Sequence, residues 1–288
     1  MILVTGANGQ LGRRIVEHLV ARLGGAEGIA VSVRDTAKAA DLAERGISVR
    51  QGDFDRPESL AQAFAGADKL VLVSTDGPKD VRIQQHRNAI AAAKAAGVAQ
   101  ILYTSFVDTR ADSPAEFAAV HRATEADLEA SGLQSTLLRN TLYADLLPVA
   151  VGPALASGVF HLPAGSGRTS FVSRDELAQA IAAAAAAPSL AKNVYELTGQ
   201  TAHDFHEVAA AVAKAAGKPI RYEPVSEDAY AEALASYGLP AWLARAVSNM
   251  YSAVAAGNFD AVSNDFAALV GHPPRPLACL VQEMFGAR

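Results

Sequence analysis

The sequence predicts an α/β protein with a doubly wound parallel sheet and a smaller, mostly helical substrate domain toward the C-terminus. Two observations support this fold class. Short apolar, β-favouring runs alternate with helical patterns through the first half of the chain, and this rhythm changes after about residue 145. Repeated βα units require parallel strands, and the connecting helices then cover both faces of the sheet.

The first strand and the first helix enclose a glycine motif. Ile2 to Thr5 form the apolar strand, and Gly6, Gly9 and Gly12 follow with the spacing G-x-x-G-x-x-G. Apolar side chains then recur with helical spacing over residues 15–20. This order of strand, glycine-rich turn and helix start is typical of a Rossmann-type site for a nucleotide pyrophosphate.

Each glycine of the motif has a separate expected role. Gly6 takes the sharp turn that leaves the strand, Gly9 lets backbone N–H groups approach a phosphate, and Gly12 lets the helix pack closely on the strand. The helix N-terminus adds free N–H groups and a positive dipole. The alternative is a glycine-rich turn that binds nothing. The predicted phosphate-binding residues are Gly6, Asn8, Gly9, Gln10, Leu11 and Gly12.

The remaining elements of the first half follow in order. We expect strands at residues 29–33, 47–51, 69–74, 100–105 and 134–139, and helices at 36–45, 57–64, 81–96 and 113–131. Pro57 fits the first position of its helix, and Gly97 fits the end of the longest one. Ligands of such sheets bind at the carboxyl ends of the strands, so the residues after each strand are the candidates.

The second half is less regular. Short strands are expected at 158–162 and 168–172, then a helix over 173–187 that starts at a Ser173/Glu176 capping box, and a strand over 193–198. From His203 onward the chain is mainly helical, with one strand near 220–223. We predict a dinucleotide-binding domain over residues 1–150, to which 173–198 return, and a smaller substrate-binding region over 151–172 and 199–288.

The end of the second strand predicts the type of dinucleotide. An acidic residue there binds the ribose 2′-OH of NAD, whereas an arginine accommodates the 2′-phosphate of NADP. Arg34 stands at this position, 22 residues after Gly12, and a guanidinium can bind phosphate bidentately. Asp35 opposes the assignment, Lys38 is a second candidate contact, and a merely solvated arginine is the alternative. We expect NADP, as NADPH.

Polar and aromatic residues follow three other strands. Asp53 and Phe54 are placed to hold the adenine, although a simple turn with a buried phenylalanine is an equal alternative. The other two strands end in residues that can line the path to the nicotinamide. The candidates are Asp53, Phe54, Ser74, Thr75, Ser105 and Phe106.

Several of these segments together resemble the atypical short-chain dehydrogenase/reductase superfamily, specifically its NmrA-like branch. They are Thr5–Gly12, Val33–Arg34, Gly52–Phe54, His121 with Thr124–Glu125, Leu137–Asn140 followed by Tyr143, and Phe171–Asp175. Within the branch the chain looks most like bacterial NADPH-dependent quinone oxidoreductases and triphenylmethane dye reductases. The resemblance implies cofactor contacts from residues 137–142. It makes Arg139, Asn140 and Tyr143 candidates for the nicotinamide and substrate pocket.

The chain departs from the superfamily at its acid residue. Typical members carry Tyr-x-x-x-Lys on the helix after the fifth strand, but residues 113–131 contain neither Tyr nor Lys, and Phe117 and His121 have that spacing. A ketone reductase must protonate a strongly basic alkoxide. A hydroquinone anion can take its proton from water, and a cationic dye accepts hydride at carbon. The missing pair therefore favours flat acceptors that need only proximity and orientation.

The candidate catalytic residues are therefore His121, Asn140 and Tyr143. His121 is a candidate proton donor, and an ordinary core or surface histidine is the alternative. We expect NAD(P)H-dependent hydride transfer, with NADPH preferred, to a quinone or similar flat acceptor. The alternatives are an NADP(H)-binding redox sensor without turnover, and a reductase of aldehydes or activated double bonds.

Composition narrows the partners. The formal net charge is −5 and no basic tract is present, so nucleic acid is not expected as a partner. The single cysteine, Cys279, permits no internal disulfide, and His203 with His206 lacks a third metal ligand, so no metal is expected. The N-terminal strand and the short apolar run 180–187 predict a cytoplasmic protein without a membrane segment. A homodimer stays open.

Four aromatic residues and a methionine gather late in the chain. They are suited to line an apolar pocket for a flat substrate, and packing in the core of the helical region is the alternative for most of them. These residues are Tyr230, Tyr237, Trp242, Met250 and Tyr251.

Overall fold

A computed structural model describes residues 1–286. Seven parallel strands form the central sheet in the order β11-β6-β5-β4-β1-β2-β3. Two halves wind outward from β1 in opposite directions, which confirms the doubly wound α/β fold. The strands are β1 (Ile2–Thr5), β2 (Ile29–Val33), β3 (Ser48–Gln51), β4 (Lys69–Leu72), β5 (Gln100–Phe106), β6 (Gln134–Asn140) and β11 (Val194–Leu197).

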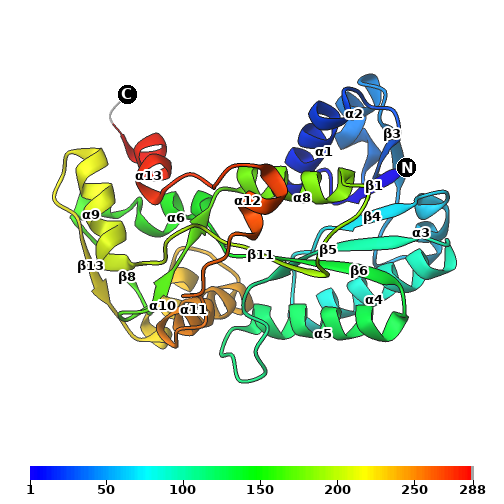
Figure 1. Cartoon of the computed structure of the whole chain (residues 1–288). Helices are drawn as coiled ribbons and strands as arrows, with labels where there is room; N and C mark the ends of the chain where they lie inside the picture. The colour runs from blue at the N-terminus through cyan, green and yellow to red at the C-terminus, as the bar shows by residue number, and fades with distance from the viewer. Residues whose placement is uncertain (287–288) are drawn as a thin grey trace.

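Helices cover both faces of this sheet (Figure 1). Leu3 and Val4 are neighbours on β1 and are both fully buried, yet they belong to separate apolar clusters. Successive strand residues point to opposite faces, so the sheet is buried on both sides. One face is covered by α1 (Gln10–Leu23), α2 (Ala40–Glu44) and α8 (Arg174–Ala186), and the other by α3 (Pro57–Phe64), α4 (Lys79–Ala95) and α5 (Glu116–Ser131).

The segment of α8 and β11 joins the sheet after the chain has left it. The expected capping box is confirmed, since Ser173 accepts from the Glu176 amide and the Glu176 side chain accepts from the Ser173 amide. The buried residues of α8 are mostly alanines, and this helix packs against α1. β11 then pairs with β6, with Leu197 opposite Asn140.

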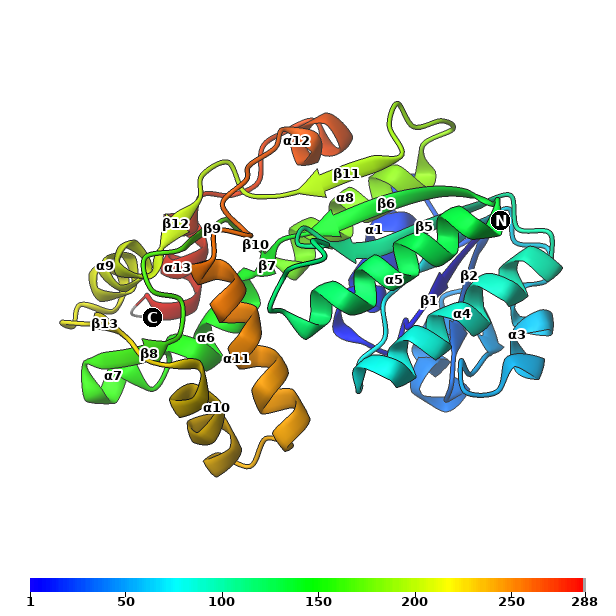
Figure 2. The same ribbon diagram turned by 90° about the horizontal axis from the view of Figure 1, so that it is seen from below.

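The second region packs around its own aromatic core. Phe160, Phe205, Tyr222 and Tyr251 are buried there with ring centroids 5.3–6.5 Å apart. Figure 2 shows the α10–α11 pair on the side of this region that faces the start of α5. Its main elements are β8 (Val159–Leu162), β13 (Arg221–Pro224), α9 (Phe205–Ala216), α10 (Glu227–Ser236), α11 (Ala241–Ala255) and α13 (Leu277–Phe285).

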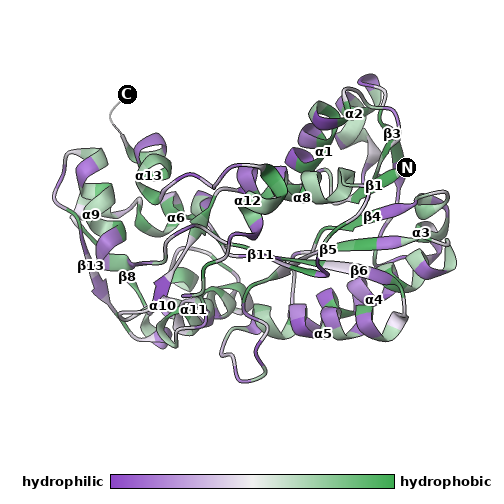
Figure 3. Cartoon of the chain, in the orientation of Figure 1, coloured by the Kyte–Doolittle hydropathy of each residue, from purple (hydrophilic) through white to green (hydrophobic). Residues whose placement is uncertain are grey.

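The remaining elements are short. Figure 3 shows apolar central strands and more polar outer helix faces, as burial of both sheet faces requires. None of the helices within residues 1–286 is long and apolar enough to span a membrane. The short elements are η1 (Thr36–Ala39), β7 (Leu142–Tyr143), η2 (Ala144–Leu146), α6 (Leu147–Val151), α7 (Ala154–Ser157), β9 (Arg168–Thr169), β10 (Phe171–Val172), β12 (His203–Asp204) and α12 (Asp265–Val270).

Four expected elements differ from the structure. The strand over 168–172 is divided into β9 and β10, which pair with β12 and β7 respectively. The helix over 36–45 is divided into η1 and α2, because Asp35 caps a tighter first turn. The helix over 113–131 starts only at Glu116, since the Ser113 hydroxyl donates to Asp108 in the preceding loop. His203 lies on β12 and not on a helix, because Asp204 caps α9 and the helix starts at Phe205.

Candidate cofactor and acceptor site

The predicted cofactor residues come together at one edge of the sheet. All seven strands are parallel, so their carboxyl ends meet there, and β6, β5, β4, β1, β2 and β3 are consecutive neighbours. The glycine motif follows β1 and Arg34 follows β2. Ser105 lies opposite Arg139 and Phe106 opposite Asn140 in the β5–β6 pairing. This is the edge at which doubly wound sheets bind ligands.

The glycine motif forms a tight loop in which Gly6 is required by its backbone conformation and Gly12 by lack of space, with Gly9 also closely packed. Gly6 adopts φ 66°, a left-handed conformation that favours glycine. A Cβ on Gly12 would lie 2.3 Å from the Gly6 carbonyl oxygen, and one on Gly9 would lie 3.2 Å from it. The turn at Gly6 and the close approach at Gly12 are therefore as the sequence predicted.

The N-terminus of α1 is open to an anion. The first N–H groups of a helix have no partner within the helix. Gly9 at the N-cap supplies no capping side chain, and no acidic residue stands in the first turn. The helix dipole and these amides thus face the loop without a competing carboxylate on the first turn, which fits a pyrophosphate.

Arg34 is a free cation beside this loop. Its side chain is exposed, and within residues 1–286 it has no ion pair. Asp35, which opposed the NADP assignment, is engaged elsewhere: one carboxylate oxygen accepts from the Ala37 amide at 3.1 Å and the other lies 3.9 Å from Lys38 Nζ. Asn8 Nδ2 donates to the Asp35 carbonyl at 2.8 Å and so ties the loop to the end of β2.

Asp53 and Phe54 make local contacts. Asp53 Oδ1 accepts from the Asp55 amide at 3.1 Å, and Asp53 Oδ2 lies 3.5 Å from Arg56 Nε. Phe54 is half-buried against the apolar cluster under α3 and α4. The turn interpretation explains these contacts, and an adenine-binding role for the pair stays a prediction.

Ser74 and Thr75 are held by residues of α4. The Ser74 hydroxyl accepts from Arg82 Nη2 at 2.9 Å, and the Thr75 amide donates to His86 Nε2 at 3.1 Å. The Ser74 amide donates to Thr104 Oγ1 at 2.9 Å. The Arg82 and His86 side chains therefore fix the end of β4, a role that was not predicted from the sequence.

His86 is a neutral histidine with a defined tautomer. It is fully buried, and because Nε2 accepts from a backbone amide, the ring proton must lie on Nδ1. Nδ1 then donates to Thr124 Oγ1 at 2.8 Å, and Thr124 donates to the Val120 carbonyl. Burial, with help from the Arg82 charge, lowers the pKa of His86 to about 3.

A sequence signal for these two residues exists. The buried face of α4 comprises Arg82, Gln85, His86, Ala89, Ile90 and Ala93, which follow helical spacing. Arg82 and His86 thus lie on the apolar stripe that packs on the sheet. Polar residues in line with such a stripe indicate buried hydrogen-bonding groups.

Ser105 and Arg139 are joined by one carboxylate. The Ser105 hydroxyl donates to Glu125 Oε1 at 2.6 Å, and Arg139 donates to both Glu125 oxygens at 3.0 and 2.7 Å. The hydrogen bonds to Glu125 raise the pKa of Arg139. Both predicted cofactor residues are therefore engaged within the protein, and direct contact of either with a cofactor stays a prediction.

Asn140 has an unused acceptor at the end of β6. Its side chain is 1% exposed, and among the described residues its Oδ1 has no hydrogen-bond partner. A buried unsatisfied carbonyl costs about 1–3 kcal/mol. Its Nδ2 lies 3.5 Å from the Tyr143 hydroxyl, and the Arg174 guanidinium stands 5.0 Å from the Tyr143 ring centroid. Burial raises the pKa of Tyr143, so this phenol stays protonated.

The residues at the strand edge fit an NADP dinucleotide. The uncapped α1 N-terminus suits the pyrophosphate, and exposed Arg34 suits the 2′-phosphate. The Asn140 oxygen suits a carboxamide N–H donor of the nicotinamide.

His121 is buried beside an unpredicted tyrosine. Its Nδ1 lies 2.8 Å from the Tyr103 hydroxyl, and its ring stacks on Phe106 with centroids 5.5 Å apart. Burial, with the Arg82 charge next in size, lowers the pKa of His121 well below its usual range. Burial also raises the pKa of Tyr103 to about 12. These surroundings favour the core-histidine alternative, and a catalytic role stays a prediction.

A small cavity joins the two regions near the end of β4. Of the late aromatic residues, Trp242 lines it, whereas Tyr237 is 79% exposed and Tyr230 and Tyr251 pack edge-to-face in the second region. The cavity is lined by Gly77, Lys79, Arg82, Glu116, Phe117, Val120, Trp242 and Ala246.

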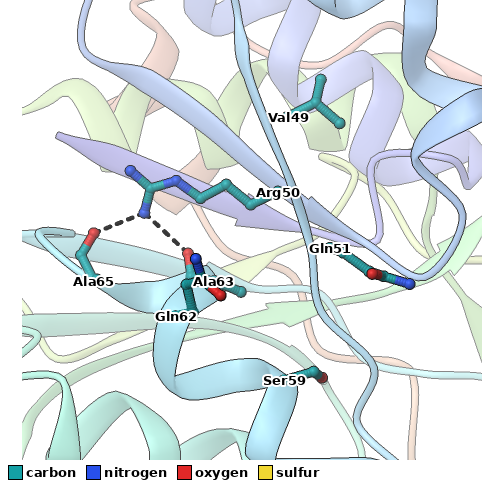
Figure 4. A pocket seen from close by; sticks show the side chains of 7 residues that line it. All are labelled: Val49, Arg50, Gln51, Ser59, Gln62, Ala63 and Ala65. Atoms are coloured by element: carbon teal, nitrogen blue, oxygen red, sulfur yellow. Dashed lines mark hydrogen bonds between the residues drawn. The ribbon is translucent and has the colours of Figure 1, made fainter.

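A separate, wider hollow lies along β3 at the sheet border (Figure 4). There the Arg50 guanidinium donates to the Ala63 and Ala65 carbonyls at 3.0 and 2.6 Å and so covers the end of α3. Its lining contains none of the predicted cofactor residues. The hollow along β3 is therefore separate from the predicted site at the carboxyl edge of the sheet.

Comparison with known proteins agrees with this geometry. Residues 1–269 match the NmrA-like family. The chain is 38% identical to quinone oxidoreductase 2 of Escherichia coli, over 99% of each chain, and 29% identical to an NAD(P)H azoreductase of Xenophilus azovorans, over 96% of each.

Two solved structures share the whole fold. The NADPH-dependent quinone oxidoreductase of Escherichia coli in complex with NADPH superposes with a TM-score of 0.93, at 38% identity, over 99% of this chain and 100% of the other. The triphenylmethane reductase of Citrobacter sp. in complex with NADP(H) gives 0.92, at 34% identity, over 98% and 99%.

Proposed function

The chain belongs to the NmrA-like family, and we propose that it is an NAD(P)H-dependent oxidoreductase that prefers NADPH and reduces a quinone or similar flat acceptor. The named activities of its relatives, quinone oxidoreductase and azoreductase, support this reaction class. The NADPH and NADP(H) bound to two solved relatives support the cofactor.

One contrast at the strand edge carries the proposal. Within residues 1–286, the groups suited to a dinucleotide have no competing partner: the α1 amides, the Arg34 guanidinium and the Asn140 oxygen. The candidate proton donors are engaged or buried: Ser105 donates to Glu125, and His121 is held by Tyr103. Such a site can hold a hydride donor, and neither Ser105 nor His121 is available as the acid that an alkoxide needs, which leaves the protonated Tyr143 phenol as the candidate for that role.

The reaction balances without a protein acid. When bound, NADPH supplies a hydride, which carries two electrons. Hydride addition to a quinone gives a hydroquinone anion, whose negative charge is delocalised and which takes one proton from water. The protein's part is to hold and orient the two reactants and to limit water around them.

The test is loss of NADPH absorbance against a panel of quinones, cationic dyes, aldehydes and enones, with NADH in parallel. We expect oxidation with quinones and a higher kcat/KM for NADPH than for NADH. Tight NADPH binding without oxidation by any acceptor would support the redox-sensor alternative. A sensor would also bind the oxidised and reduced cofactor with different affinities. The cytoplasmic location expected from the sequence stays a prediction.

A further inference from the structure

Arg82 is a buried arginine without a carboxylate partner. Its side chain is 5% exposed, and within residues 1–286 no carboxylate oxygen lies within 4.0 Å of it. Nη2 donates to the Ser74 hydroxyl at 2.9 Å, whereas Nε is buried and has no hydrogen-bond partner among the described residues. Of the Nη2 and Nε donor groups, only Nη2 therefore has a hydrogen-bond partner among the described residues.

This arrangement is costly for the folded protein. Arginine is rarely buried unless it is paired, and an unpartnered charged donor loses its hydration without compensation. Asp76 is close enough to favour the charged form, but burial is the larger effect and lowers the pKa of Arg82. A cost of this kind at a strand edge is typical of a functional residue.

Arg82 lines a small cavity between the two regions, with room for a group of about one water's size, such as a single acceptor oxygen. Its guanidinium lies 5.5 Å from the Phe117 ring centroid, and both residues line the cavity between the two regions. Trp242 of α11 also lines this cavity, and Lys79 and Glu116 are its other charged lining residues. The partly unpaired cation therefore lies near the Phe117 ring, in a cavity that a second aromatic residue from the other region also lines.

We propose that Arg82 recognises the electron acceptor by binding one of its oxygens, so that the site selects neutral or anionic oxygen acceptors over cationic dyes. The proposal rests on the proposed quinone reduction and specifies its substrate class. During hydride transfer two electrons enter the quinone and its oxygen becomes negative before water protonates it. A fixed, dehydrated cation at that oxygen stabilises the developing charge. The same cation repels a dye that carries a positive charge.

The chain supplies its own binding probe. Trp242 is its single tryptophan and lines the cavity that Arg82 lines. Occupancy can therefore be followed by quenching of Trp242 emission without NADPH, separately from NADPH oxidation. The probes are 1,2-naphthoquinone-4-sulfonate as an anion, 1,4-naphthoquinone as a neutral acceptor and malachite green as a cation.

The variants separate charge from shape. Arg82→Met removes the charge and keeps the length, and Arg82→Lys keeps the charge but loses the planar fork. The matched control is Arg87→Met, which removes the same charge from the same helix at a half-exposed pair with Asp127, outside the cavity lining. Circular dichroism and melting curves of all three establish that they fold.

For the wild type we expect the Kd order anion, neutral, cation, from tightest to weakest. In Arg82→Met the Kd of the sulfonate should rise about 10-fold or more, as expected for loss of a charge-assisted hydrogen bond. The Kd of the dye should fall in Arg82→Met. Both Kd values of Arg82→Lys should lie between those of the wild type and Arg82→Met, and those of Arg87→Met should match the wild type. The melting temperature of Arg82→Met should be equal or higher, because a buried unpaired charge is removed.

Two results would overturn the proposal. One is a ratio of sulfonate to dye affinity that stays within twofold of the wild type in folded Arg82→Met. The other is failure of Arg82→Met to fold while Arg82→Lys folds and keeps the wild-type ratio, which would make Arg82 a structural cation. Charge-ranked quenching without NADPH oxidation by any acceptor would keep the Arg82 assignment and refute the quinone reductase function instead.

Discussion

The two ends of the proposed site are built in opposite ways. At the phosphate end, the α1 N-terminus and Arg34 are exposed and free of competing carboxylates on the first turn. At the acceptor end, Arg82 and His86 are buried and share the Ser74 hydroxyl, and buried Tyr103 packs edge-on against His86. The first end is complete before any ligand arrives, while the second holds polar groups in place at a cost in stability.

This difference corresponds to two roles, dinucleotide binding at the phosphate end and acceptor selection at the other. Binding of a dinucleotide needs only backbone amides and a cation that can donate hydrogen bonds to its phosphates. Acceptor selection needs groups whose charge state is fixed by burial and does not depend on solvent. Variants at the two ends should therefore change different measured properties. The predictions below run from the largest expected effect to the smallest.

The largest effect is expected at the phosphate end. In Gly12→Ala the new Cβ would lie 2.3 Å from the Gly6 oxygen, a contact that requires α1 to move off the loop. We expect the Kd of NADPH to rise by roughly 100-fold or more, about 3 kcal/mol. Titration calorimetry measures it. Gly25→Ala is the control, because a Cβ there meets nothing within 4 Å. Equal affinities of the two variants would contradict the assigned role of the loop.

The next largest effect is expected at the acceptor end, where the stability of the folded protein should depend on pH in the acid range. His86 has a pKa of about 3 in the folded protein and an ordinary value of 6.5. Between these values the unfolded chain binds more protons, so the free energy of unfolding decreases as pH falls through this window. At pH 4 the loss from His86 alone is about 3 kcal/mol.

Urea unfolding at pH 7 and pH 4 measures this loss. His86→Gln removes the titrating group and should reduce the decrease in the free energy of unfolding between the two pH values. His161→Gln, at an exposed histidine of β8, should retain the wild-type decrease. If His86→Gln is as acid-sensitive as the wild type, the buried group does not hold His86 neutral in the way described.

A smaller effect at the phosphate end should sharpen the choice of cofactor. Arg34→Ala removes a cation that has no ion pair within residues 1–286, so stability should change little. We expect the Kd of NADPH to rise about 10- to 100-fold, as for loss of a charge-assisted contact, and that of NADH by less than about threefold. Arg45→Ala, also exposed, is the control. Equal effects on the two cofactors would contradict the NADP assignment.

The sequence predicts the phosphate end well for a physical reason. A glycine turn and a helix start depend on neighbouring residues, so the conformation of Gly6 and the packing at Gly12 were both predicted. The element bounds of β1, β2 and α3 agree for the same reason. Even the ambiguity at Asp35 is resolved by a local contact, its cap on η1.

The acceptor end could not be predicted from neighbouring residues in the sequence. Ser105 and Arg139 belong to different strands, and only the folded sheet brings both to Glu125 of α5. Arg82 carries a local signal, its place on the buried stripe of α4, but that signal does not say that the guanidinium lacks a carboxylate. The partners of a buried polar group are a property of tertiary packing.

The smallest effect on catalysis is expected at His121. In His121→Phe the ring stacked on Phe106 is kept and the contact with the Tyr103 hydroxyl is lost. We expect kcat/KM with a quinone to stay within about threefold of the wild type, because water supplies the proton, and stability to fall by about 1–3 kcal/mol from the unpaired phenol.

The double variant His121→Phe/Tyr103→Phe distinguishes the two roles of His121. Removing the orphaned hydroxyl should recover part of the lost stability without changing kcat/KM, since both changes act on packing and not on the reaction. A loss of 100-fold or more in kcat/KM in folded His121→Phe would make His121 the proton donor. The buried group at the acceptor end would then take part in the reaction itself, and its contrast with the phosphate end would be one of chemistry as well as of construction.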